Sequence, residues 1–350
     1  MRPNLNYFGE IDSAKRIAII VHKNSDMDAI GSAVALKRII KKNSKQKERI
    51  IDIFSDTFNI ESDNIQKNLY APFLKNEDVN KKSCKQYDLA ICLDTANNKL
   101  LGKYESILKI AKDTLNIDHH QTNTIYANKN IVLPKYSSTC EIIYQLLIKM
   151  RHLKYSGDIA RLIYAGIITD TNNLTNNLYK STFRFIDEIS GNNTKVMVEL
   201  ERIRNYFFKN ESKAKFELLK KALQSTKFAC DGKMAMMKFT KKDISDAKAV
   251  MTDTLGIVDY ATKIQGVEIA CMFIKQSDNS YYVSLRSKND IDVGKIAAQF
   301  GGGGHTKIAA FQTKKNVSLP DLKNKLVSIC EQELKDYDVI DDLNDLFNEE

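Results

Sequence analysis

The first half of this 350-residue chain alternates short apolar runs with amphipathic stretches, and this alternation constrains the fold more than any other feature. Four of the runs have the length and composition of β-strands: RIAIIVH (16–22), RIIDIFSD (49–56), QYDLAICLD (86–94) and TLNID (114–118). Helical periodicity is found at 28–42, 100–112, 138–150 and 158–171. Strands separated by helices indicate βαβ units. We therefore predict an α/β fold in which a doubly wound, mainly parallel sheet carries helices on both faces.

The second half has a different pattern, and the chain length favours two domains at roughly 150 residues each. From about 183 to 225 charged helix formers predominate, which predicts one or two connecting helices. Beyond them, strand-like runs at 233–244, 267–277 and 281–288 alternate with helical patterns at 251–264, 293–300 and 319–335. We predict a first domain at 1–185, a helical linker at 186–225 and a smaller α/β domain at 226–345.

Composition and the cysteine pattern indicate the cellular environment in which we expect the protein. No run approaches the roughly 20 uninterrupted apolar residues of a membrane helix, and the start has no apolar signal-peptide core, so we expect a cytoplasmic protein that does not bind membranes. Six cysteines lie far apart without a C-x-x-C pair, which favours buried reduced thiols over disulfides or zinc. The net charge of +9 has two interpretations, a phosphate-rich ligand or the lysine-rich composition of an AT-rich genome.

Four polar clusters carry the candidate chemistry, and three of them follow predicted strands. They are His22 with Asp26 and Asp28, then Asp94, then Asp118-His119-His120, and finally Asp170 after a helical stretch. Ligands of open parallel sheets bind at the carboxyl ends of the strands. Five carboxylates and three histidines gathered there require counter-charge, which two divalent cations would supply. Carboxylate and imidazole ligands without thiolate favour manganese, iron or zinc, with magnesium as an alternative, and paired metals typically serve displacement at phosphorus.

The same clusters resemble a known family. HKNSDMDAIGS (22–32), LDTAN (93–97), DHH (118–120) and GIITDT (166–171), in that order, look like the four motifs of the DHH phosphoesterase superfamily. In the second half, GKIAAQFGGGGHTKIAAF (294–311) and SLRSK (284–288) resemble the glycine-rich motif and the arginine-bearing strand of the DHH-associated substrate-binding domain. The resemblance covers nearly the whole chain and is strongest to nanoRNase/pAp phosphatase proteins.

The resemblance implies a role for each matching residue. One metal ion would be held by His22, Asp26 and Asp94, and a second by Asp28, His119, Asp170 and the bridging Asp94. Mn²⁺ is the favoured ion and Mg²⁺ the alternative. His120 would face the substrate phosphate as a charge stabiliser or proton donor, so the catalytic residues would be His120 and Asp94. Asp118 would support the histidines, as metal-bound imidazoles normally require.

The remaining candidate residues would bind substrate. Four consecutive glycines after a helical stretch can approach a ligand closely and offer backbone N–H groups to an anion. The candidates in the second domain are Arg286, Gly301, Gly302, Gly303, Gly304 and His305. Ser138 and Thr139 match a hydroxyl pair that the family places near the site, although capping of a helix is an equally good interpretation.

By resemblance, the chain would hydrolyse short oligoribonucleotides or 3′-phosphoadenosine 5′-phosphate (pAp) by means of a hydroxide activated by two metals. The nearest alternative is a phosphodiesterase for cyclic-di-AMP or pApA. A RecJ-like exonuclease, a family II pyrophosphatase and a catalytically silent nucleotide-binding module fit less well. The stretch DTANNKLLG (94–102) carries Lys99 where many relatives have arginine, which affects the substrate preference more than the metals. A homodimer is left open.

Overall fold

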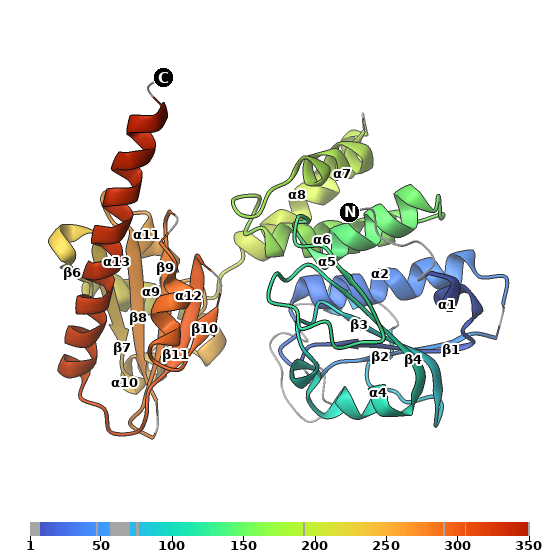
Figure 1. Cartoon of the computed structure of the whole chain (residues 1–350), viewed down its shortest axis with the longest axis horizontal. Helices are drawn as coiled ribbons and strands as arrows, with labels where there is room; N and C mark the ends of the chain where they lie inside the picture. The colour runs from blue at the N-terminus through green and yellow to red at the C-terminus, as the bar shows by residue number, and fades with distance from the viewer. Residues whose placement is uncertain are drawn as a thin grey trace. The chain divides into compact units, whose positions relative to one another are not determined.

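A computed structural model of the chain describes residues 8–46, 48–56, 71–74, 77–191, 193–276, 278–289, 291–304 and 306–348. The chain forms two compact units, Met1–Asn210 and Glu211–Glu350, and each unit contains one sheet (Figure 1). The sheet of the first unit is parallel and that of the second is mixed. The α/β class predicted from the alternating pattern is therefore confirmed.

The first unit is built on five parallel strands in the order β2-β1-β3-β4-β5. Their bounds are β1 Arg16–Val21, β2 Ile50–Phe54, β3 Tyr87–Leu93, β4 Ala111–Asp118 and β5 Lys129–Val132. This order is one of the two common doubly wound orders, and its direction reverses between β1 and β3. The edge strand β5 was not predicted, because its four residues, KNIV, are too few to show a strand pattern.

Helices cover both faces of this sheet, and the strands alternate between two cores. Ile17, Ile19 and Val21 of β1 point into the larger core, while Ala18 and Ile20 point into the smaller one. The larger core is covered by α1 Phe8–Ser13, α2 Met27–Asn43, α5 Thr139–Ile143, the π-helix η4 Tyr144–Met150, α6 Gly157–Asp170, α7 Lys180–Ser190 and α8 Thr194–Phe208. The 3₁₀-helix η3 Asn98–Glu105 and α4 Ser106–Ile110 cover the smaller core. Figure 1 shows α2, α5 and α6 on one side of the sheet and α4 on the other.

The second unit contains six strands in the order β10-β11-β9-β8-β7-β6, in which only β7 and β8 are parallel. The strands are β6 Lys227–Ala229, β7 Met234–Phe239, β8 Ile269–Lys275, β9 Tyr281–Ser287, β10 Gly303–Gly304 and β11 Ile308–Gln312. The helices are α9 Lys213–Gln224, η5 Cys230–Gly232, α10 Lys241–Asp246, η6 Met251–Thr254, α11 Asp259–Thr262, α12 Val293–Ala298 and α13 Leu319–Asn348. Met234 and Met236 face the core that α12 and α13 cover, whereas Ala235 and Met237 face the core of α9 and α11.

Two predicted helices and the predicted linker differ in detail. The helix expected at 100–112 is a 3₁₀-helix followed by a short α4, and its last two residues already belong to β4. The helix expected at 251–264 is interrupted, because Gly256 adopts a positive φ of 78° between η6 and α11. The stretch expected to form one or two connecting helices forms α7, α8 and α9, of which α7 and α8 belong to the first unit.

Two compositional predictions can be compared with the structure. All six cysteines are free thiols in the structure, and four of them are buried. Among the helices that the structure describes, none has the length and apolar character needed to cross a membrane.

Candidate functional site

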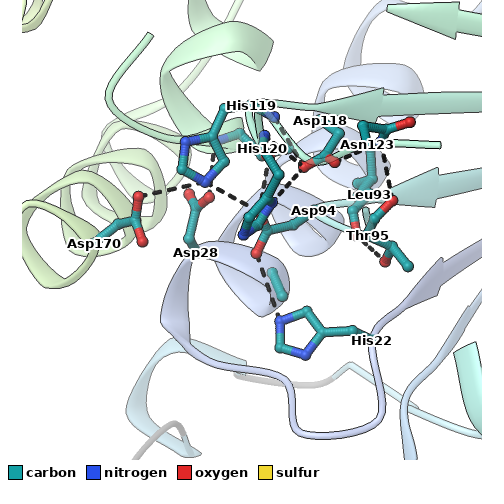
Figure 2. A network of polar contacts seen from close by, with 12 residues as sticks. His22, Asp28, Leu93, Asp94, Thr95, Asp118, His119, His120, Asn123 and Asp170 are labelled. Atoms are coloured by element: carbon teal, nitrogen blue, oxygen red, sulfur yellow. Dashed lines mark hydrogen bonds and ion pairs between the residues drawn. The ribbon is translucent and has the colours of Figure 1, made fainter. Parts of the chain in front are cut away.

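The four polar clusters meet at one edge of the first sheet. His22 follows β1, Asp94 follows β3, and Asp118 is the last residue of β4. Because these strands are parallel, their carboxyl ends lie at the same edge, and the strand order reverses between β1 and β3, the position at which open α/β sheets bind their ligands. Asp170 reaches this edge from the last residue of α6. Figure 2 shows the clusters facing one another.

The gathered side chains form three overlapping groups of possible metal ligands. They are His22, Asp26 and Asp94; then Asp28, His119 and Asp170; and then Asp94, His119 and His120. Asp94 lies between His22 and His119, because its Oδ2 is 3.6 Å from His22 Nε2 and its Oδ1 is 3.5 Å from His119 Nε2. The two oxygens of one carboxylate thus face two different ligand groups, as a bridging ligand would require.

The two carboxylates of the D-M-D sequence are held by helix N-termini. Asp26 caps α2, accepting from the backbone N–H of Ala29 at 3.0 Å. Asp28 is 1% exposed and accepts from the backbone N–H groups of Thr139 at 2.7 Å and Cys140 at 2.9 Å. The first turn of α5 therefore fixes both oxygens of Asp28, although 111 residues separate it from Thr139 in the sequence.

Ser138 and Thr139, for which the sequence left helix capping and substrate binding open, make different contacts. Ser138 is fully buried and caps α5, because its Oγ accepts from the backbone N–H of Glu141 at 3.1 Å. Thr139 Oγ1 instead donates to Asp94 Oδ1 at 3.0 Å. Asp94 itself has a positive φ of 55°, an uncommon backbone conformation for a residue other than glycine. The geometry of Ser138 matches the capping interpretation, and Thr139 orients a candidate bridging ligand.

A glycine of α6 makes room for this arrangement. A Cβ atom added to Gly166 would lie 2.3 Å from Cys140 Sγ and 2.9 Å from Asp28 Oδ1. Ordinary carbon contacts begin near 3.4 Å. Gly166 therefore allows α6 to approach both α5 and the Asp28 carboxylate.

The electrostatics of the cluster reflect crowded negative charge. Burial, reinforced by the neighbouring carboxylates, raises the pKa of Asp28 and Asp170 well above the ordinary value. Burial also opposes the ionisation of Asp94, but the contact with His22 and the charges of His120 and His119 outweigh it and lower the pKa of Asp94. Burial lowers the pKa of His119, which favours the neutral imidazole that metals bind.

These residues fit divalent cations. Asp170 Oδ2 is buried and has no hydrogen-bond partner among the described residues, although His119 Nε2 lies 3.5 Å away. A buried carboxylate oxygen left in this state is costly unless a cation approaches it. The donors are carboxylate oxygens and imidazole nitrogens, and the candidate groups include no thiolate. Such a set suits a divalent metal of the manganese type.

A second network orients His120 (Figure 2); Asp118 was expected to support the histidines, whereas Asn123 was absent from the sequence predictions. His120 Nδ1 lies 2.7 Å from Asp118 Oδ1, and Asn123 Nδ2 donates to Asp118 Oδ2 at 2.6 Å. Burial acts against protonation of His120, but the bond to Asp118 and the charge of Asp94 raise the pKa of His120 to about 10. Asn123 also donates to Asn116 Oδ1 at 2.8 Å. The polar run QTN directly after D-H-H was the available signal for Asn123.

In the second unit, the four glycines divide into two pairs. A Cβ atom on Gly302 or Gly304 would lie 2.3 or 2.4 Å from backbone oxygens of β11, so these two glycines permit close strand packing. Gly301 and Gly303 have nothing within 4 Å of that position, and they remain open to a ligand. Gly301 also has a positive φ of 76°, which glycine tolerates.

The other two candidate substrate-binding residues of this unit are Arg286 and His305. Arg286 lies on β9, where its Nε donates to Asp259 Oδ1 at 2.6 Å, so a carboxylate already orients the guanidinium. His305 lies outside the described residues. In the first unit, Lys99 is exposed at the start of η3.

The fold and the cluster define a two-domain α/β protein with a candidate dinuclear metal centre at the carboxyl edge of a parallel sheet. Residues 16–167 match the family model "DHH family, N-terminal domain", and residues 232–336 match the DHHA1 domain. The chain thus carries a DHH N-terminal domain followed by a DHHA1 domain, the domain pair of DHH/DHHA1 phosphoesterases.

Curated relatives are distant. The chain is 28% identical over 304 residues to the "Probable bifunctional oligoribonuclease and PAP phosphatase NrnA" of Streptococcus mutans, covering 82% of this chain and 86% of that protein. It is 25% identical over 334 residues to the "Cyclic-di-AMP phosphodiesterase GdpP" of Geobacillus thermodenitrificans. That match covers 93% of this chain but spans only 47% of GdpP.

A solved structure supports the fold. An exopolyphosphatase-related protein from Bacteroides fragilis superposes with a TM-score of 0.75 at 23% identity, and the match covers 96% of each chain. At this identity the likeness concerns the fold alone.

Proposed function

We propose that this chain is a metal-dependent phosphoesterase that hydrolyses short oligoribonucleotides, pAp, or both. The observation that carries the proposal is the placement of Asp94, whose two carboxylate oxygens face two different groups of candidate ligands. A carboxylate shared between two ions would suit a dinuclear centre for displacement at phosphorus.

Each ion would have its own residues. His22, Asp26 and Asp94 would hold one, and Asp28, His119 and Asp170 would hold the other together with Asp94. Divalent ions such as Mn²⁺ or Mg²⁺ would supply acidification of the attacking water and neutralisation of the charge on the phosphoryl oxygens. The N-terminus of α5 would keep Asp28 in position, and Thr139 would do the same for Asp94.

His120 would act on the phosphate rather than on a metal. Its Nδ1 is engaged by Asp118 at 2.7 Å, whereas Asp94 Oδ1 lies 3.7 Å from the same atom. The Asp118 carboxylate fixes the ring and favours the imidazolium form. A cationic His120 could therefore stabilise developing negative charge or donate a proton to the leaving oxygen.

The substrate class rests on the second unit and on the relatives. Gly301, Gly303 and Arg286 are its candidate anion-binding groups, together with His305, and they suit a nucleotide phosphate. NrnA of Streptococcus mutans is described as an oligoribonuclease and PAP phosphatase and matches most of both chains, which favours short RNA and pAp. GdpP matches 93% of this chain, and this coverage makes cyclic-di-AMP or pApA hydrolysis the second candidate function.

A direct comparison of rates tests the proposal. Purified protein with Mn²⁺ is assayed on a short RNA, pAp, pApA, cyclic-di-AMP and pyrophosphate, with EDTA and Asp94→Asn as matched controls. We expect turnover of the short RNA or pAp to exceed that of the other substrates, and each control to abolish it. A higher rate on cyclic-di-AMP would favour the second candidate function, and no turnover of any phosphoester by metal-loaded protein would contradict both.

A further inference from the structure

A cavity of about 380 Å³ lies in the first unit, away from the metal centre. Its wall is formed by α1, the C-terminal end of α2, the loop that follows α2, and the end of the π-helix η4. Figure 1 shows α1 beside one end of α2. The metal-centre residues Asp26 and Asp28 belong to the opposite end of this 17-residue helix. At 1.5 Å per residue, roughly 25 Å of helix separates the two places.

The charged groups that line the cavity are mainly cationic. Lys45, Arg49 and Arg151 contribute three positive charges, and Asp12 contributes one carboxylate. That carboxylate is engaged by Arg151, whose Nη2 lies 2.5 Å from Asp12 Oδ2. Arg49 contacts only the backbone oxygen of Asp12, so its charge is not matched by an ion pair with any described residue. Burial lowers the pKa of Arg49, and the charge of Asp12 offsets this effect only in part.

Two further features of the cavity wall indicate which kind of anion it would bind. Gln46 Oε1 and Arg49 Nε are buried, and each lacks a hydrogen-bond partner among the described residues. An unpaired acceptor and an unpaired donor in one wall suit a ligand that offers both kinds of group. The rest of the wall is apolar, with Ile39, Ile40 and Leu147 as its main residues. The volume falls at the lower end of the range for small-molecule sites, about 300–1,000 Å³.

We propose that this cavity is a second ligand site that binds one nucleoside monophosphate. The phosphate would lie against Arg49, with Lys45 nearby. The base would lie on the apolar wall, and an amino or hydroxyl group of the nucleoside would donate to Gln46 Oε1. The size of the cavity favours a single nucleotide over an oligomer. This binding is independent of the metal centre and does not require the proposed hydrolytic activity.

The test is calorimetric titration of the full chain with 5′-AMP after removal of metal by EDTA. We expect saturable binding of one AMP per chain, and Arg49→Ala should weaken it by about tenfold to a hundredfold, as loss of a charged hydrogen bond predicts. Lys41→Ala removes the same charge from an exposed position of α2 outside the cavity wall, so it should change the affinity less than about twofold. Unchanged affinity in Arg49→Ala would overturn the proposal without touching the proposed function.

Two further measurements need no variant. Adenosine, ribose 5-phosphate and inorganic phosphate should each bind at least tenfold more weakly than AMP, because each lacks part of the contacts. Equal binding of inorganic phosphate would overturn the assignment to a nucleotide. Hydrogen exchange of the wild-type chain should slow at 43–46 and 147–153 when AMP is added. Unchanged exchange in both segments at saturating AMP would place the ligand elsewhere.

Discussion

Replacement of Gly166 by alanine tests how the metal centre depends on helix packing. The added Cβ would lie 2.3 Å from Cys140 Sγ and 2.9 Å from Asp28 Oδ1. Cys140 is fully buried at the start of α5, so the clash can be relieved only if α5 and α6 separate. Overpacking of this kind costs about 1–3 kcal/mol, and the helix propensity of alanine returns at most about 1 kcal/mol.

The two effects leave a net loss of about 1–2 kcal/mol in the free energy of unfolding, since the 2.3 Å contact lies at the severe end of the range. For a unit of this size the loss corresponds to a decrease in Tm of roughly 2–8 °C. The Mn²⁺ affinity should fall as well, because α5 supplies the two N–H groups that hold Asp28. Thermal denaturation followed by circular dichroism, and Mn²⁺ titration of the folded variant, measure the two effects.

Matched variants separate the causes. Gly157→Ala lies in the same helix with nothing within 4 Å of the added atom, so its stability should be unchanged or slightly raised. Adding Cys140→Ala to Gly166→Ala removes the sulfur contact but keeps the one to Asp28. The double variant should therefore regain stability while its Mn²⁺ affinity stays low. Wild-type Tm and wild-type Mn²⁺ affinity in Gly166→Ala would refute the reasoning.

Two further predictions concern a hydrogen-bond network and an ion pair. Asn123→Ala removes the donor to Asp118 and should lower kcat by about 10- to 100-fold, because Asn123 orients His120 through Asp118. Mn²⁺ content and KM should change little, as steady-state kinetics and metal analysis can measure. A change in KM without a change in kcat would contradict this role. The hydrogen bond from Arg16 lowers the pKa of Asp88, so its contribution to stability is present above the unfolded pKa of about 4 and is lost as pH falls further. The difference in unfolding free energy between wild type and Asp88→Asn, measured in urea, should therefore shrink from pH 6 to pH 3, and a constant difference would contradict this origin.

The strands of the first unit were predictable because their signal is local. Buried parallel strands are continuous apolar runs, and RIAIIVH and QYDLAICLD have no other good interpretation. The polar residues that follow such strands must share an edge of the sheet, so the pattern alone predicts that His22 and Asp94 lie together. The short strands β5 and β10 were not predictable, because two to four residues carry no periodicity.

Other features depend on contacts between distant segments. Nothing near Asp28 in the sequence indicates that the N-terminus of α5 would hold it, or that Gly166 would leave room for it. In the sequence, Asn123 is one polar residue among several, and only the fold places its side chain against Asp118. Arg49 and Arg151 line one cavity although about a hundred residues separate them. Tertiary packing decides these features.

The most direct test of the central claim is the number of metal ions bound per chain. Protein saturated with Mn²⁺, freed of excess ion by gel filtration and analysed by mass spectrometry of the metal, should contain two ions per chain in the wild type. Asp94→Asn should retain at most one, because Asp94 contacts both ligand groups. Asp88→Asn, a charge change at the opposite end of β3, serves as the control and should retain two. Two tightly bound ions in Asp94→Asn, or none in the wild type, would contradict the assignment of Asp94 as the bridge between two metal sites.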